Sequence, residues 1–409
     1  MTSNLKPPHV IIVGGGFGGL YAARGLADAH VQVTILDKHN YHLFRPMLYQ
    51  VATGLLSADE IAAPIRSIFC RQKNVEVFMD EVVGVDPQRR FVQTADRSVH
   101  YDYLVLATGI HYNYFGHDEW KKFAPGLDSV DDADRIRGRI LTAFEAAEHK
   151  AAESGANHTE IAKLLTFVLV GGGTAGVELA GTIAEIARMA LTGDFRHINP
   201  REAHIILFEA APRILPSYPE ELSDRACVHL REIGVDVRTN AKVESVDASG
   251  VIVNGQRVWS STVLWSAGVV ASPAGQWLGA ETDRAGRVKV TADLSVPGLP
   301  NVFVIGDTAA WLRRREIFSA FGRDRSCCPA SLSRPYKRAN MLPASSNGGS
   351  QDNHRRSRSH IGTKGTLRSS AAALPWPICN RCASPAWWHG SYGSAFTFTF
   401  LSVLLTACS

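Results

Sequence analysis

The sequence predicts an α/β fold built from two parallel-sheet domains of the same kind. At residues 10–20 (VIIVGGGFGGL) an apolar run is followed by glycines and then by a helical pattern. The same order is found at residues 167–179 (FVLVGGGTAGVEL). A third apolar run, residues 299–310, carries a Gly-Asp pair near its end. A short β-branched strand that feeds a glycine turn and a helix is the repeating unit of Rossmann-like folds. We therefore expect two such domains in this chain.

The two glycine turns predict two nucleotide sites. Each has the G-x-G-x-x-G spacing, and the helix after it directs backbone N–H groups and the positive end of its dipole at a pyrophosphate. One such motif is a weak signal, because glycine turns also close helices onto strands for packing alone. Two complete strand–turn–helix–strand contexts strengthen it. The expected nucleotide-binding glycines are Gly14, Gly16, Gly18 and Gly19 in the first unit and Gly171, Gly173 and Gly176 in the second.

An acidic residue ends the strand that follows each turn. Asp37 lies 18 residues after Gly19, near the spacing at which a carboxylate accepts hydrogen bonds from ribose hydroxyls. Glu209 lies 33 residues after Gly176, because a longer loop intervenes. The alternative for either acid is a solvated strand end. An acid at Glu209 without an adjacent arginine favours NADH over NADPH, although Arg213 follows four residues later.

The duplication continues beyond the turns. Short strand-like pieces within residues 75–102 lead into YLVLATG, and similar pieces within residues 235–260 lead into TVLWSAG. Each unit should therefore contain an inserted three-strand meander and a last strand that returns to a glycine at the carboxyl edge of the sheet. These glycines are Gly109 and Gly268, where a missing side chain lets the backbone approach a bound cofactor.

The order of glycine turn, ATG, second glycine turn and Gly-Asp resembles the two-dinucleotide-binding flavoprotein oxidoreductases, which have the glutathione-reductase-like fold. Within that superfamily, residues 40–66 (NYHLFRPMLYQVATGLLSADEIAAPIR) and residues 171–181 (GGGTAGVELAG) are similar to the type II, non-proton-pumping NADH:quinone oxidoreductases. The superfamily's disulfide reductases fit badly, because they need a redox cysteine pair where this chain has only Cys70.

The resemblance implies FAD in the first unit and NADH in the second. It places Pro46, Gln50 and Thr53 near the isoalloxazine and Glu178 at the junction of nicotinamide and flavin, while a helix-first-turn carboxylate placed for the dipole is the alternative for Glu178. Asp307 would supply a carboxylate to the ribityl chain of FAD. The remaining FAD-site residues implied in this way are Lys38, Val82, Ala107, Thr108 and Gly306.

By the same resemblance, NADH reduces FAD and the electrons pass to a membrane quinone without proton pumping. The expected location is cytoplasmic, at the inner face of the plasma membrane if the family's anchor were intact, and a homodimer is possible. Two alternatives stay open at this stage. One is a nucleotide-binding remnant without quinone reductase activity, and the other is a soluble NADH diaphorase.

The composition changes abruptly after Ala310. Up to that residue the chain has 29 Lys and Arg against 36 Asp and Glu, whereas residues 311–409 have 14 against 3, with five of the seven cysteines and sixteen serines. A basic block can bind nucleic acid or anionic membranes. This one has no sustained period of strand or helix and is typical of disorder, so we expect no nucleic-acid partner. Cys379 and Cys382 lack the second pair of a zinc site, and no metal is expected.

A shifted reading frame would explain this tail. Residues 386–390 (AWWHG) are necessarily encoded GCN TGG TGG CAY GGN, and reading from the third base forces Val-Ala. Continued in that frame, permitted codons give an aromatic, amphipathic segment that resembles the membrane-anchoring end of the family. Our hypothesis is a frame shift shortly after Ala310.

The expected domain organisation follows. An FAD domain comprises residues 1–125 and 295–310, and an NADH domain comprises residues 126–294 with a linking helix at residues 131–153. That helix has apolar and alanine positions at helical spacing, which favours a structural role. Residues 311–409 form the aberrant basic tail.

Overall fold

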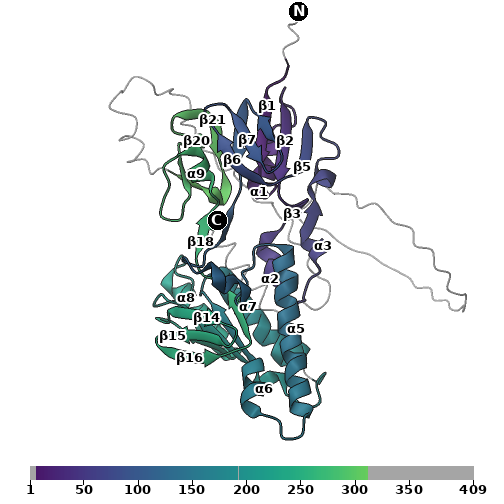
Figure 1. Ribbon diagram of the computed structural model, residues 1–409, viewed down its shortest axis with the longest axis vertical. Coiled ribbons are helices and arrows are strands. Elements are labelled where there is room, and N and C mark those ends of the chain that lie inside the picture. Colours follow the sequence, from purple (N-terminus) through teal and green to yellow (C-terminus); the bar gives the residue numbers. More distant parts are fainter. Residues whose placement is uncertain (1–5, 192, 312–409) are drawn as a thin grey trace, which may run out of the picture. The chain divides into compact units, whose positions relative to one another are not determined.

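The computed structural model describes residues 6–191 and 193–311, and it contains two parallel sheets (Figure 1). The first sheet has the strand order β20-β21-β9-β1-β2-β5, in which β20 alone runs antiparallel to its neighbour. Its strands are β1 (His9–Val13), β2 (Gln32–Asp37), β5 (Val75–Met79), β9 (Tyr103–Leu106), β20 (Ser295–Val296) and β21 (Leu299–Val304).

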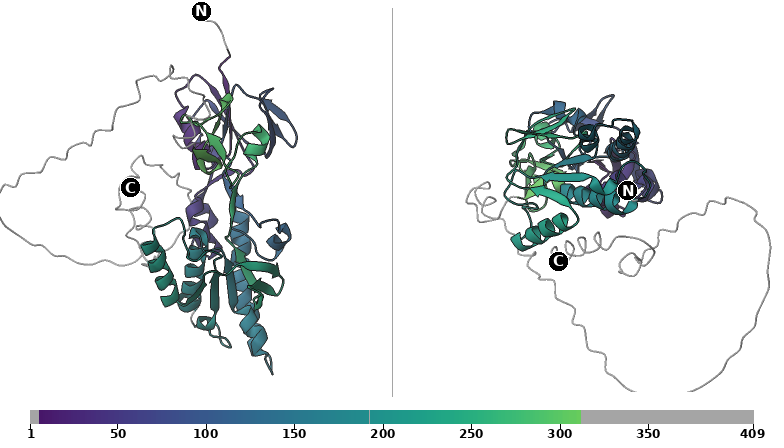
Figure 2. Two further views of the ribbon diagram at one scale, coloured as in Figure 1. Left: turned by 90° about the vertical axis from the view of Figure 1, so that its left-hand side faces the viewer. Right: turned by 90° about the horizontal axis from the view of Figure 1, so that it is seen from below.

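The central strands of this sheet are buried on both faces. Ile11, Ile12, Ile35 and Leu104 have no exposed surface, as expected for strands that read as continuous apolar runs. Figures 1 and 2 show strands from the two ends of the described chain, purple and green, in this one sheet, where β9 lies between β1 and β21 and pairs with both. The predicted α/β fold with two dinucleotide-binding units is confirmed.

The second sheet repeats the first with fewer strands. Its order is β13-β12-β11-β17, all parallel, from β11 (Thr166–Val170), β12 (His204–Phe208), β13 (Val235–Arg238) and β17 (Thr262–Trp265). Each unit also has the expected antiparallel meander: β6 (Val82–Asp86), β7 (Phe91–Thr94) and β8 (Ser98–His100) in the first, β14 (Val243–Asp247), β15 (Gly250–Val253) and β16 (Gln256–Trp259) in the second.

An antiparallel ribbon connects the two halves. Its strands are β10 (Ile110–Tyr112), which comes next along the chain after β9, and β18 (Val269–Ala271), which comes next after β17. After β10 the chain packs with the second sheet, because Tyr114 and Trp120 belong to the core that contains Trp265. After β18 it packs with the first sheet, because Ala274 to Val290 contribute to the core around Ile11.

This packing bears on the expected domain boundaries. The expected boundaries place residues 114–124 in the first domain and residues 274–290 in the second, whereas each segment contributes to the core of the other sheet. The composition of these short segments carries no sign of which sheet they cover. We therefore propose that the chain crosses between domains at the ribbon, near residues 111 and 270, rather than at residues 125 and 295.

The linking helix is α5 (Val130–Ala152), one residue displaced from the expected range. Ser129 caps it by accepting a hydrogen bond from the Asp132 N–H, and Asp132 reaches back to the Ser129 N–H in a capping box. The buried face of α5 carries Ile136, Ile140 and Phe144. This face packs against α2 (Leu48–Ala52), α6 (His158–Leu164) and β17.

The other described α-helices are α1 (Phe17–Gly25), α3 (Ala58–Ile61), α4 (Ile65–Ile68), α7 (Thr174–Glu185), which continues into a π-helical turn at Ile186–Ala190, α8 (Glu220–Glu232) and α9 (Ala274–Leu278). The remaining described strands are β3 (Tyr41–Leu43), β4 (Ala62–Pro64), β19 (Val288–Val290) and β22 (Ala309–Trp311). Among the residues placed by the structure, no helix is both long and apolar enough to cross a bilayer. The tail from residue 312, its Cys379–Cys382 pair and the frame-shift hypothesis lie outside the described residues.

Candidate active site

The first glycine turn is built so tightly that two of its positions exclude any side chain. Gly14 has a φ of +102°, and a Cβ added at Gly19 would lie 1.8 Å from the Gly14 carbonyl oxygen. These glycines let α1 start directly against the end of β1. Gly16 is different, because a Cβ there would meet no described atom within 4 Å. A side chain at Gly16 would fill the space in front of the α1 N-terminus, where a pyrophosphate would bind.

The second turn repeats this geometry. Gly171 has a φ of +109°, and a Cβ at Gly176 would lie 1.9 Å from the Gly171 carbonyl oxygen. A Cβ at Gly173, the N-cap residue of α7, would again meet no described atom within 4 Å. The residues present therefore fit a second bound nucleotide in the same way as the first.

The two acidic residues are held identically despite their different distances from the turns. The Asp37 carboxylate accepts hydrogen bonds from the N–H groups of Gly15 at 2.5 Å and His39 at 2.6 Å. The Glu209 carboxylate accepts from Gly172 at 2.6 Å and Ala211 at 2.7 Å. Each carboxylate is thus fixed beside the middle glycine of its turn, where the sequence analysis expected a ribose. Lys38 next to Asp37 is exposed.

Arg213, the arginine nearest to Glu209 in the following loop, donates hydrogen bonds to the backbone. The Arg213 guanidinium donates hydrogen bonds to the carbonyl oxygens of Tyr218 at 2.8 Å and Pro216 at 2.9 Å. These bonds hold the guanidinium against the backbone of the loop that follows β12. This arrangement supports the expected preference for NADH.

Residues far apart in sequence meet at the carboxyl edge of the first sheet. A Cβ at Gly14 would lie 2.4 Å from the Ala107 carbonyl oxygen, and one at Gly18 would lie 3.3 Å from the Ile305 side chain. The Thr108 and Thr308 hydroxyls lie 3.3 Å apart, and Thr308 donates to the Gly109 carbonyl oxygen at 3.2 Å.

Two further glycines leave open space at this edge. Gly109 and Gly306 each have a φ of +69° and nothing described within 4 Å of an added Cβ. Asp307 is exposed beside Gly306. Val82 is instead buried in the hydrophobic core with Val13 and Leu36.

The segment expected beside the flavin forms a short helical turn. Pro46 is exposed within the 3₁₀ turn Arg45–Met47, whereas Gln50 on α2 and Thr53 after it are each only 9% exposed. The Thr53 hydroxyl donates to the Tyr49 carbonyl oxygen at 2.8 Å, and the Gln50 amide donates to the Tyr49 hydroxyl at 3.2 Å. Because α2 packs against α7, this segment touches the helix that carries Glu178.

Glu178 lies in a poorly solvated position on α7. Burial raises the pKa of its carboxyl group to about 8. Burial also raises the pKa of Tyr112 to about 12, with smaller contributions from the charges of Asp128 and Glu178. A carboxyl group with this pKa is mostly neutral at pH 7, so Glu178 can hold a proton that an ordinary glutamate would release.

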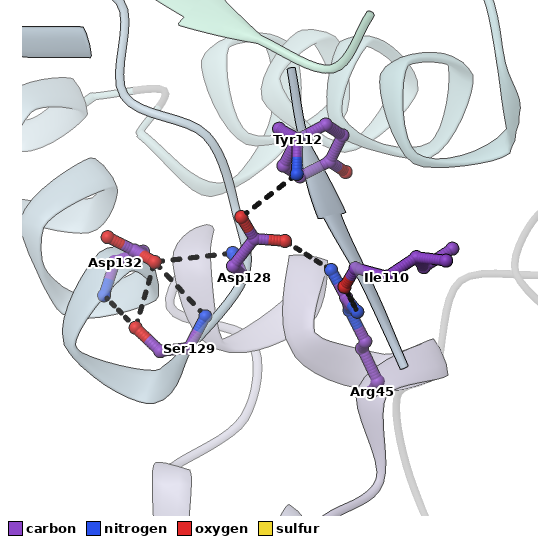
Figure 3. A network of polar contacts seen from close by, with 6 residues as sticks. All are labelled: Arg45, Ile110, Tyr112, Asp128, Ser129 and Asp132. Carbon is purple, nitrogen blue, oxygen red and sulfur yellow. Dashed lines mark hydrogen bonds and ion pairs between the residues drawn. The ribbon is translucent and has the colours of Figure 1, made fainter. Parts of the chain in front are cut away.

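Arg45 and Asp128 form an ion pair that the sequence analysis missed (Figure 3). Arg45 also donates to the Ile110 carbonyl oxygen at 2.8 Å, and Asp128 accepts from the Tyr112 N–H at 3.2 Å. The pair therefore holds both ends of β10. The partners are 83 residues apart, and no local pattern signals such a contact.

Comparison with known proteins identifies the fold as that of a known family. The pyridine nucleotide-disulphide oxidoreductase family matches residues 8–324. The solved structure of NDH2 from Plasmodium falciparum in complex with NADH superimposes with a TM-score of 0.67 at 24% identity, over 74% of this chain and 65% of that one. At this identity the likeness concerns the fold.

Curated relatives are closer in sequence. The type II NADH:quinone oxidoreductase Ndh of Mycobacterium tuberculosis is 44% identical over 321 residues, which cover 75% of this chain and 68% of that protein. The type II NADH:quinone oxidoreductase NdhA of the same organism is 45% identical over 313 residues, covering 73% and 66%. The matched part thus spans about two thirds of the length of these relatives. On this sequence similarity, the chain belongs to the type II NADH:quinone oxidoreductases, a family of oxidoreductase enzymes.

Proposed function

We propose that this chain oxidises NADH and reduces a quinone, with FAD as its cofactor. The observation that carries the proposal is the pair of matching nucleotide cradles, each with an open glycine before a helix N-terminus and a carboxylate fixed beside it. When bound, FAD supplies the redox chemistry, accepting a hydride from NADH and passing two electrons on.

The residues of the first unit would bind FAD. Gly14, Gly16, Gly18 and Gly19 shape the space for its pyrophosphate, and Asp37 is positioned to accept hydrogen bonds from a ribose. Thr108, Gly109, Gly306 and Asp307 converge at the same sheet edge and would bind the remainder of the cofactor. The Val82 side chain lies in the hydrophobic core, where it would support this sheet edge.

The residues of the second unit would bind NADH. Gly171, Gly173 and Gly176 form its pyrophosphate cradle, Glu209 would bind the adenosine ribose, and Gly268 marks the opposite end of the site. A 2′-phosphate would meet the Glu209 carboxylate, while hydrogen bonds to two backbone carbonyls hold the Arg213 guanidinium in the loop after β12. We therefore expect NADPH to be a poor substrate.

Pro46, Gln50, Thr53 and Glu178 would line the junction between the two cofactors. The contact of α2 with α7 supports this role for Gln50, Thr53 and Glu178. The raised pKa of Glu178 suits a group that holds a proton at its carboxyl oxygen while quinone reduction consumes protons. Attachment to the inner face of the plasma membrane and a homodimer stay predictions.

Anaerobic titration tests the proposal. The full chain is purified, its flavin absorbance is recorded, and NADH is added without oxygen. We expect stoichiometric FAD that bleaches on addition of NADH and recovers when a soluble quinone is added. Flavin that stays oxidised would contradict NADH oxidation, and bleached flavin that does not recover with quinone would limit the activity to other electron acceptors.

A further inference from the structure

Phe115 has an unusual backbone conformation. Its φ is +53°, which is costly for a bulky residue and persists only where neighbours enforce it. Asn113 supplies that enforcement. Its side-chain oxygen accepts the Phe115 N–H at 2.8 Å, its own N–H donates to the Gly268 carbonyl oxygen at 2.9 Å, and its carbonyl oxygen accepts the Trp265 indole N–H at 3.1 Å. The loop is thus tied to the carboxyl end of β17.

Packing against the core does not explain the position of the Phe115 ring. The neighbouring rings of Tyr114 and Trp120 are buried, 5.0 Å and 5.6 Å from the Trp265 ring centroid. Phe115 touches Trp265 only edge-on at 6.4 Å and remains 63% exposed. Its ring lies directly over Gly268, where an added Cβ would be 2.4 Å from the ring. The loop therefore holds an exposed ring over a glycine of the proposed NADH site.

The strand order shows which half of the dinucleotide lies nearby. The glycine turn follows β11, Glu209 follows β12 on one side of it, and Gly268 follows β17 on the other side. With the adenosine ribose at Glu209 and the pyrophosphate at the turn, the nicotinamide half extends toward β17. Gly268 and Phe115 lie at that end.

We propose that Phe115 is a binding residue for the nicotinamide-ribose half of NADH. Its ring covers the end of β17 and packs against this half of the substrate, which excludes water from the site of hydride transfer. The inference rests on the proposed function, because it assumes that NADH binds to the second unit.

Binding of NAD⁺ and ADP to the full chain tests this role without turnover. ADP carries the adenosine and pyrophosphate but lacks the nicotinamide ribose. The variant Phe115→Asn removes the ring and keeps a residue type that tolerates the left-handed conformation. We expect it to weaken NAD⁺ binding about tenfold in calorimetry, with ADP affinity unchanged. Phe115→Leu keeps apolar bulk and should lose less affinity than Phe115→Asn.

The matched control is Tyr103→Asn, which removes a 44% exposed ring on β9 and should change neither affinity. Equal NAD⁺ affinity in Phe115→Asn and the unaltered protein would overturn the inference, as would a parallel loss for NAD⁺ and ADP at an unchanged melting temperature. If the unaltered protein bound neither ligand, the proposed function itself would be wrong and this inference with it.

Discussion

Within each glycine turn, some glycines are required by the fold and others by the proposed ligand. Gly19 and Gly176 are required by the fold, because any side chain would overlap a backbone carbonyl. Gly16 and Gly173 face open space, so the fold alone does not require them. The motif G-x-G-x-x-G hides this difference, since all its glycines look alike in the sequence.

This difference predicts unequal effects of alanine substitution. Gly19→Ala should destabilise the protein by about 1–3 kcal/mol through overpacking and also impair FAD binding. Gly16→Ala should lower the melting temperature of the FAD-free protein less than Gly19→Ala, because only the N-cap preference is lost, and it should still weaken FAD binding, because the methyl group enters the cradle. Thermal melts and flavin titrations of the two variants measure both effects. Gly25→Ala at the end of α1, where an added Cβ also meets open space, is the control for helix composition.

Glu178 predicts a pH-dependent contribution to stability. Burial raises the pKa of its carboxyl group from the ordinary value of 4.5 to about 8 in the folded protein, so the folded state binds the proton more tightly. The stabilisation linked to that proton is complete below about pH 4.5 and is lost as the pH rises through 8. Glu178→Gln carries no titrating group. The free energy of unfolding of Glu178→Gln, relative to that of the unaltered protein, should therefore increase from pH 5 to pH 8 in denaturant titrations. A difference that does not change with pH would contradict the raised pKa.

Among the helices and strands, those with a local sequence pattern could be predicted, and those that depend on long-range pairing could not. Strands such as β1 and β11, both glycine turns and helix α5 have local signatures in apolar periodicity and turn residues. The β10–β18 ribbon has none, because its three-residue strands are too short to show a period and pair across the whole second domain. The same reason explains why we propose boundaries at the ribbon rather than at residues 125 and 295, since no local pattern shows which core residues 114–124 and 274–290 contribute to.

The Arg45–Asp128 pair predicts a measurable coupling at the ribbon. Both side chains are about one third exposed, so solvent screens their interaction and we expect a coupling energy of no more than about 1 kcal/mol. Arg45→Gln and Asp128→Asn should each speed hydrogen exchange of the Tyr112 amide, which donates to Asp128. A double-mutant cycle measures the coupling. Purely additive effects with unchanged exchange would show that the pair does not hold β10.

At the scale of the whole molecule, the proposed FAD site gathers residues from three distant parts of the chain. Gly14–Gly19, Thr108–Gly109 and Gly306–Asp307 are contiguous in space because β1, β9 and β21 are adjacent in the sheet. The sequence predicted these residues from motifs and family resemblance. It could not predict that the ring of Phe115 lies over Gly268, because the two residues are far apart in the sequence.

This arrangement predicts that FAD stabilises the fold. A ligand that binds only the native state contributes about 2.7 kcal/mol at a concentration of 100 times its Kd. For a protein of this size, FAD at such an excess should raise the melting temperature of flavin-free protein by several degrees. Differential scanning fluorimetry with increasing FAD measures the shift. Asp37→Asn should reduce it, and no shift for the unaltered chain would contradict FAD binding.

The β10–β18 ribbon also bears on how such a chain can be assembled or taken apart. Tyr112 and Val269 are paired residues on its two strands, so the second domain, with the boundaries proposed above, begins and ends at adjacent residues. A segment with adjacent ends can be inserted into a host, or removed from it, at a single surface location without stretching either part. Because Ile110 and Ala271 are themselves paired, a short turn joining them would close the first domain without the second.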